Sequence, residues 1–111
     1  MPWLLRDGEV LAVLEVVEGL AGRSRGLLGR DGVEGALLIK PARSVHTIGM
    51  RFPIDVAFCD RGMRVIATVT MARYRIGRPR LRARCVLEAE AGAFGRWTLL
   101  PGDQLEIKGE P

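Results

Sequence analysis

The sequence has few of the residues that build disulfide frameworks or metal sites. Its 111 residues include two cysteines, Cys59 and Cys85, and one histidine, His46. These are too few for a disulfide framework, and no spacing among them matches a zinc site. We therefore expect no metal site and no cofactor. We expect both cysteines to be buried thiols, because a bond between them would need an oxidising compartment.

Long apolar runs are missing as well. Runs such as "ALLI" and "VIA" fall far short of the roughly 20 residues that span a bilayer. The opening residues, "MPWLLRDGEVLAV", have no basic leader before an apolar core and contain Arg6, Asp7 and Glu9. They therefore do not match a secretory signal. The sequence predicts no membrane segment and a cytoplasmic location.

What remains is the composition of one globular domain. Apolar residues make up 48% of the chain and charged residues 27%, which is typical of a folded protein and not of a disordered one. A chain of 111 residues is long enough to bury a core, so we treat residues 1–111 as a single domain. The 14 glycines and 6 prolines indicate many turns, as in a chain of short strands.

Alternating and valine-rich segments predict about seven short strands and one helix. The strands are expected at residues 9–17, 35–41, 44–50, 54–60, 63–71, 85–92 and 103–108. The clearest hairpin turns through Asp60, Arg61 and Gly62, where the glycine can take a positive φ. Apolar residues at helical spacing predict a short helix near residues 20–28. This pattern favours a mainly β, compact fold of the sandwich or barrel-like kind, similar to a jelly roll.

Four motifs follow one another along the chain. They are "RSRGLLGR" (residues 23–30), "MRFPID" (50–55), "LEAEAG" (87–92) and "GD" (102–103). In this order the sequence resembles the family called domain of unknown function 192. It departs from that family at Leu28, where methionine is common, and at "HTIG", where many relatives have an aromatic residue followed by tryptophan. The resemblance implies a compact β-sandwich-like fold with one short helix and implies no activity, and some relatives are exported.

The stretch "HTIGMRFPID" holds the main candidate site. A glycine and a proline shape its backbone, and Met50 lies at its centre. His46, Arg51 and Asp55 are polar groups that a purely structural corner would not need together. We therefore hypothesise that this stretch is a strand–turn–strand corner whose side chains open onto one functional concavity.

Asp55 is expected on a largely buried face of the strand that begins at Ile54. A buried carboxylate needs a partner, and the candidates are Arg51, Arg23 and Arg25. Three roles remain open for Asp55. It holds backbone amides at a turn, which we favour, or it contacts a ligand, or it takes part in catalysis.

Glu88 shares one strand face with Val86 and Glu90 in "VLEAEAG". Two carboxylates on one face can carry out acid–base chemistry, as in glycoside hydrolysis, or they can form an exposed face that pairs with arginine. We favour a Glu88 that is paired with an arginine. A nucleophilic pair of His46 with Cys59 or Cys85 is formally available, but both cysteines lie in apolar runs, where thiols tend to be inert.

The segment "ARYRIGRPRLRARC" is strongly basic, with six arginines. If it is extended, its alternating arginines lie on one side of the chain and attract phosphates. These alternating residues are Arg78, Arg80, Arg82 and Arg84. Only Tyr74 offers stacking nearby, so the segment does not favour nucleic-acid binding, and a solvated loop face is the simpler interpretation.

These observations favour a non-catalytic binding module for a small polar or anionic ligand or a protein partner. Its expected pocket is lined by Arg25, His46, Met50, Arg51, Asp55 and Glu88. One alternative is a hydrolase or lyase that uses Asp55 and Glu88 on a carbohydrate-like or other polar substrate. Another is a nucleic-acid or anionic-surface binder that uses the basic segment. We favour the first, because the sequence supplies no set of nucleophile, base and orienting group.

Overall fold

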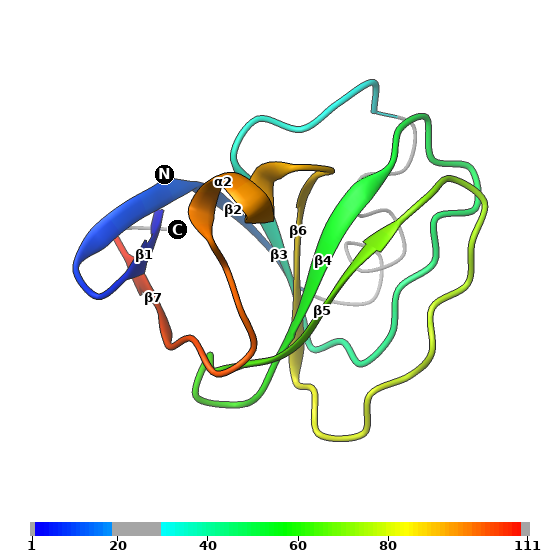
Figure 1. Cartoon of the computed structure of the whole chain (residues 1–111). Helices are drawn as coiled ribbons and strands as arrows, with labels where there is room; N and C mark the ends of the chain where they lie inside the picture. Colours follow the sequence, from blue (N-terminus) through cyan, green and yellow to red (C-terminus); the bar gives the residue numbers. More distant parts are fainter. Residues whose placement is uncertain (1, 19–29, 110–111) are drawn as a thin grey trace.

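The computed structural model describes residues 2–18 and 30–109, which form a seven-stranded sheet and one short helix (Figure 1). The strands are β1 (Trp3–Arg6), β2 (Glu9–Glu18), β3 (Ala36–Lys40), β4 (Ile54–Cys59), β5 (Val65–Met71), β6 (Cys85–Glu90) and β7 (Leu105–Lys108). The helix is α2 (Ala93–Trp97). The helix expected near residues 20–28, together with Arg23 and Arg25, lies outside the described residues.

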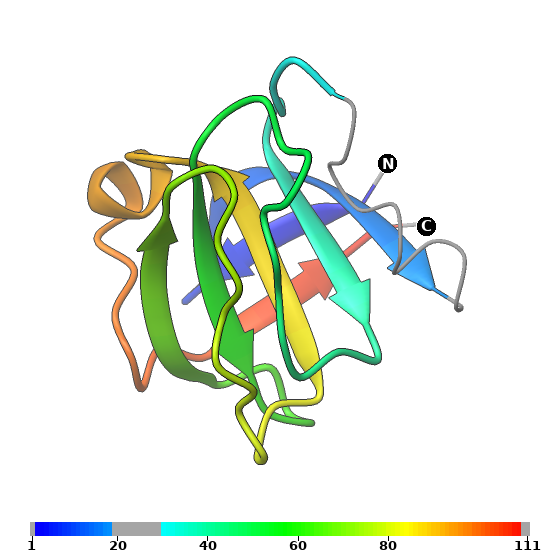
Figure 2. The same cartoon turned by 90° about the vertical axis from the view of Figure 1, so that its right-hand side faces the viewer.

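The strands form one mixed sheet in the order β5-β4-β6-β3-β2-β1-β7. Strands β2 and β3 are parallel, and the other neighbours are antiparallel. The sheet curves strongly (Figure 2). Backbone hydrogen bonds from Val65 to Asp103 (2.9 Å) and from Leu105 to Met63 (3.0 Å) bring its two edge strands together at one end. The mainly β prediction is confirmed, and the sheet is curved without closing into a barrel.

The sheet separates two apolar cores. The inner core, enclosed by the curve, receives side chains such as Leu14 and Leu38. The outer core lies on the opposite face of β3, β4 and β6 and includes Leu37 and Phe58. All six residues of β4 are buried, because successive side chains of a strand point to opposite faces and both faces are covered here.

Two loops cover the outer core. One spans residues 41–53, between β3 and β4, and the other spans residues 72–84, between β5 and β6. They run side by side along one side of the molecule (Figure 1), and we call them the two-loop ribbon. The backbone hydrogen bonds that join them include Gly77 N to Val45 O (2.8 Å), Thr47 N to Arg75 O (2.7 Å) and Arg80 N to Arg43 O (2.8 Å).

Thr47 fixes the crossing of these loops with its side chain. Its hydroxyl donates to the carbonyl of Ala72 (2.6 Å) and accepts from the amide of Arg75 (2.8 Å). Thr47 is fully buried. Its hydroxyl therefore has no hydrogen bonds to bulk water, and these bonds to the protein replace them. The ribbon therefore holds a defined conformation although it contains no regular strand.

The hairpin prediction is confirmed, with Asp55 of β4 opposite Thr70 of β5. Its turn differs in one respect, because the positive φ (67°) falls on Met63 and not on Gly62. The side chain of Asp60 accepts hydrogen bonds from the amides of Gly62 (2.9 Å) and Arg64 (3.0 Å) and holds the turn. A carboxylate that bonds to the backbone just after it is a common way to stabilise a turn.

The prediction of a strand at residues 44–50 is wrong. That segment is a loop with one isolated bridge, between His46 and Ile76. Gly49 takes a positive φ (82°), which breaks the extended conformation, and Thr47 bonds to the neighbouring loop in place of a strand ladder. Strand β1 and helix α2 were not predicted, because four and five residues are too few for a clear periodic pattern.

Candidate functional site

Asp55 holds the start of helix α2. One carboxylate oxygen accepts a hydrogen bond from the hydroxyl of Thr70 (2.6 Å). The other accepts from the amides of Gly92 (2.9 Å) and Phe94 (3.1 Å), at the first turn of the helix. Asp55 is buried on the inner-core face of β4. Its contacts match the structural role that the sequence favours, and the positive end of the helix suits a carboxylate.

The other residues of "HTIGMRFPID" point elsewhere. Arg51 is mostly exposed and pairs with Asp31 (2.6 Å), not with Asp55. His46 is exposed, and Met50 is buried in the outer core. Asp55 and Met50 thus lie on opposite sides of the sheet. The stretch does not bring its predicted site residues into one concavity.

Asp55 and Glu88 also point to opposite faces of the sheet. In the register of β4 and β6, Asp55 lies opposite Ala89, whereas Glu88 lies opposite Val56. Cross-strand partners share a face and sequence neighbours do not, so Glu88 belongs to the outer-core side. The two carboxyl groups therefore cannot act on one bond, and the hydrolase alternative loses its catalytic pair.

Glu88 is buried between apolar neighbours. Its side chain is 4% exposed, and the residues opposite it on β3 and β4 are Leu37 and Val56. No ion pair joins it to any residue of 2–18 or 30–109, so the expected pairing with an arginine is not found there. Burial raises the pKa of Glu88 to about 7, because removing a carboxylate from water penalises its charged form.

The basic segment does not form a single row of arginines. A tight turn at Leu81 and Arg82, closed by a hydrogen bond from Ala83 N to Arg80 O (3.0 Å), reverses the chain. Arg78 and Arg80 therefore lie on one side of this turn, and Arg84 lies on the other, where it lines a hollow of about 350 Å³ with Arg43. The condition under which all four alternating arginines would share one side is not met, because the segment is not extended throughout.

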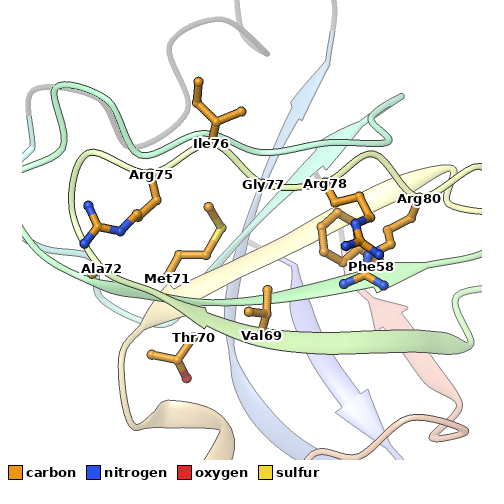
Figure 3. A pocket seen from close by; sticks show the side chains of 10 residues that line it. All are labelled: Phe58, Val69, Thr70, Met71, Ala72, Arg75, Ile76, Gly77, Arg78 and Arg80. Atoms are coloured by element: carbon orange, nitrogen blue, oxygen red, sulfur yellow. The ribbon is translucent and has the colours of Figure 1, made fainter.

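A pocket of about 420 Å³ opens between edge strand β5 and the loop of residues 72–84. Figure 3 shows the side chains of Val69 and Met71 rising from β5 toward the loop, while Thr70 points to the opposite side. Phe58 of β4 extends this apolar floor. The guanidinium of Arg80 lies over the Phe58 ring, 5.3 Å from its centroid, at a distance typical of a cation–π contact.

Three arginines line this pocket, and we call it the arginine pocket. They are Arg75, Arg78 and Arg80, and no carboxylate is among the lining residues. The Nε of Arg80 is buried, and none of the residues that the structure describes accepts a hydrogen bond from it. A buried donor without an acceptor is rare in proteins, so this atom needs an acceptor that the described residues do not supply.

Glu88 lies near the arginine pocket but does not line it. Val56 is opposite both Val69 and Glu88, so the three residues form one row across the outer face. Adjacent strands are about 4.8 Å apart, which puts the backbone of Glu88 about 10 Å from that of Val69. Sequence analysis identified Arg78 and Arg80 as anion-binding candidates, and it missed Phe58, Val69 and Met71. The alternation along β5 was the signal that places Val69 and Met71 on one face.

A second pocket of about 420 Å³ lies beside helix α2. Trp3 and Trp97 line it, and Arg96 at its edge already pairs with Glu90 (3.0 Å). Its charges are therefore balanced within the protein, in contrast to those of the arginine pocket. Such a surface offers an anionic ligand no free cation.

Other kinds of site find no support in the described residues. Those residues contain no group of three histidine, cysteine, aspartate or glutamate side chains that could hold a metal. Cys59 and Cys85 lie directly opposite each other on β4 and β6, and both are buried free thiols. No helix in the described part of the chain is long and apolar enough to cross a membrane.

Comparison with known proteins supports the fold and the family. No curated protein matches the sequence. A crystal structure from Novosphingobium aromaticivorans DSM 12444, of a protein of unknown function, matches with a TM-score of 0.78 and 21% identity, over 95% of this chain and 83% of that chain. A crystal structure from Sinorhizobium meliloti 1021, described as a candidate transcription regulator, matches with a TM-score of 0.80 and 20% identity, over 96% and 91% of the two chains. Residues 3–107 match the family DUF192, described as an uncharacterized ACR. The chain therefore belongs to the domain of unknown function 192 family.

Proposed function

We propose that this protein is a non-catalytic domain that binds a small anionic ligand with an apolar part in the arginine pocket. The observation that carries the proposal is that Arg78 and Arg80 lie together beside Phe58, with Arg75 at the other end of the same pocket, and that no carboxylate lines it (Figure 3). Guanidinium groups bind carboxylates and phosphates through paired hydrogen bonds. The exposed apolar lining, with Val69 and Ile76, suits a ring or a short aliphatic group.

The free charge of the pocket arginines supports an anion as ligand. Arg78 and Arg80 form no ion pair with any residue of the described ranges. Arg80 also has its buried Nε donor without an acceptor. Hydrogen bonds to charged groups are among the strongest in proteins, so an anionic oxygen at this position gains both charge pairing and a hydrogen bond.

The arrangement of the two buried carboxyl groups supports binding without catalysis. Asp55 is fully occupied by the hydroxyl of Thr70 and two amides of helix α2. Glu88 lies on the outer face of the sheet, opposite to the face of Asp55, and neither carboxyl lines the arginine pocket. A nucleophile with a base and an orienting group is not assembled in this pocket.

Calorimetric titration with three probes tests the proposal. We expect phenyl phosphate, which combines a ring with an anion, to bind at least about tenfold more tightly than inorganic phosphate or phenol. The factor follows from roughly 1.4 kcal/mol for each missing part. Equal binding of phosphate and phenyl phosphate would argue against the apolar floor, and no binding of any anion would overturn the proposal.

A pair of arginine variants localises the binding. Arg80→Gln removes one positive charge and the fork donors of the pocket, so the affinity for phenyl phosphate should fall by about tenfold or more. Arg61→Gln removes the same charge from the exposed β4–β5 turn, outside the pocket, and should leave the affinity almost unchanged. Equal losses in both variants would mean that only the net charge of the protein attracts the probe.

A further inference from the structure

The two-loop ribbon presents the most exposed large apolar side chains among the described residues. Leu81 is 81% exposed and Ile76 is 77% exposed. Tyr74, on the same loop, and Ile48, on the neighbouring loop, are 60% and 49% exposed. Isolated exposed apolar residues are ordinary, but several of them on one joined segment indicate an interaction surface.

The same ribbon concentrates positive charge. Residues 41–53 and 72–84 contain eight arginines and no aspartate or glutamate. The rest of the chain is left with nine basic and thirteen acidic residues, so the charge of the molecule is strongly uneven. Basic side chains that surround exposed aliphatic ones match an anionic lipid surface, which offers phosphates outside and hydrocarbon beneath.

We propose that the two-loop ribbon docks on an anionic lipid bilayer. Its arginines lie over the headgroup phosphates, and the side chains of Ile48, Tyr74, Ile76 and Leu81 enter the interfacial layer. The hydrogen bonds between the loops, such as Gly77 N to Val45 O (2.8 Å), fix the loop backbones before docking. The protein therefore loses less conformational entropy on binding than it would if the loops were disordered before docking.

Other partners fit these features less well. Binding of single-stranded nucleic acid relies on aromatic stacking, and the ribbon contains Tyr74 and Phe52 beside several aliphatic side chains that nucleic acid would not cover. A second copy of this chain would place arginine-rich loops against each other, and like charges at an interface repel. The lipid surface is the partner that uses both the positive charge and the exposed aliphatic groups.

Vesicle flotation tests this inference. We expect the protein to float with vesicles that contain phosphatidylglycerol and not with vesicles of phosphatidylcholine alone, and the binding should weaken as salt is added. Ile48→Ser combined with Leu81→Ser should lower the vesicle affinity about tenfold or more, because it removes the apolar contacts. Val10→Ser combined with Leu100→Ser removes exposed apolar groups outside the ribbon and should have little effect.

Three results would overturn the inference. The first is equal binding to neutral and anionic vesicles, and the second is an equal loss of vesicle affinity in the two double variants. The third is binding to a mixed-sequence oligonucleotide that is tighter than binding to vesicles and that the Ile48→Ser and Leu81→Ser double variant leaves unchanged. Neither Ile48 nor Leu81 lines the arginine pocket, so the ribbon variant should keep its affinity for phenyl phosphate. Failure of vesicle binding is therefore distinguishable from failure of the proposed small-ligand site.

Discussion

Asp55 and Glu88 lie on adjacent strands, and the pleat of the sheet gives them opposite surroundings. Asp55 finds three hydrogen-bond donors on the inner side. Glu88 finds apolar neighbours on the outer side and no ion-pair partner among the described residues. The first carboxylate therefore stabilises the fold, and the second reduces its stability when it is charged.

Removing the charge of Asp55 should destabilise the protein. In Asp55→Asn, the side chain keeps one acceptor oxygen for the amides of α2 and loses the other, so we expect the free energy of unfolding to fall by about 1–3 kcal/mol. Urea titration measures this change. Asp31→Asn, which removes an exposed carboxylate, should change stability by less than about 0.5 kcal/mol. A stable Asp55→Asn protein would show that the hydrogen bonds to α2 contribute little.

The raised pKa of Glu88 makes a prediction about pH. A carboxyl whose pKa is higher in the folded state stabilises the fold while it is protonated, and this contribution is lost as the pH rises from about 4.5 to about 7. Glu88→Gln should therefore match the parent at pH 4 and exceed its stability by roughly 3 kcal/mol above pH 7.

Denaturation of both proteins across this pH range measures the difference. Glu106→Gln, at an exposed position on β7, controls for the loss of one negative charge. A Glu88→Gln protein that is less stable than the parent at pH 8 would show that the charged carboxylate has a favourable partner in the folded protein.

At the scale of elements, the ribbon depends on the close approach of its two loops. A Cβ added at Gly77 would lie 2.7 Å from the backbone oxygen of Val45, which is shorter than real contacts of this kind. Gly77→Ala should therefore push the loops apart and cost about 1–3 kcal/mol of stability. It should also weaken binding in the arginine pocket, because Gly77 lines it.

Gly32→Ala provides the matched control for this substitution. A Cβ at Gly32 would meet no atom within 4 Å, so the change should be neutral or slightly stabilising. Thermal denaturation of the two variants compares them directly. Equal melting temperatures would contradict the close packing of the loops at Gly77.

The elements that could be predicted are those with a strong local signal. The alternation in β4 and the turn sequence Asp60-Arg61-Gly62 predicted the hairpin correctly. Helix α2 could not be predicted, because it has five residues and is held by Asp55 from a distant part of the chain. The ribbon could not be predicted either, since the bonds of Thr47 join loops that no periodic pattern relates.

At the scale of the whole molecule, the candidate site could be predicted only in part. The excess of arginine in the basic segment was visible in the sequence, and it predicted an affinity for anions. The turn at Leu81 divides the arginines of this segment between two sides, and the loop that contains it folds back over the edge of the sheet. This folding also places Arg80 above the apolar floor at Phe58. Long-range packing of this kind leaves no local mark in the sequence.

The uneven charge of the molecule gives a prediction of its own. Because the arginine pocket and the ribbon share one basic side, the affinity for any anion should fall as ionic strength rises. Titration of phenyl phosphate at several salt concentrations measures this dependence. Arg61→Gln should leave the slope almost unchanged and Arg80→Gln should reduce it, whereas equal slopes in both variants would contradict a local site.

The most direct test of the central claim, that the arginine pocket binds an anion with an apolar part, is a nuclear magnetic resonance titration with phenyl phosphate. We expect the amide signals of Arg75, Gly77 and Arg78 to shift together with the Nε–H signal of Arg80, because these groups line one pocket. The signals of Trp3 and Trp97, which line the second pocket, should stay in place. Shifts at the tryptophans without shifts at the arginines would contradict the account.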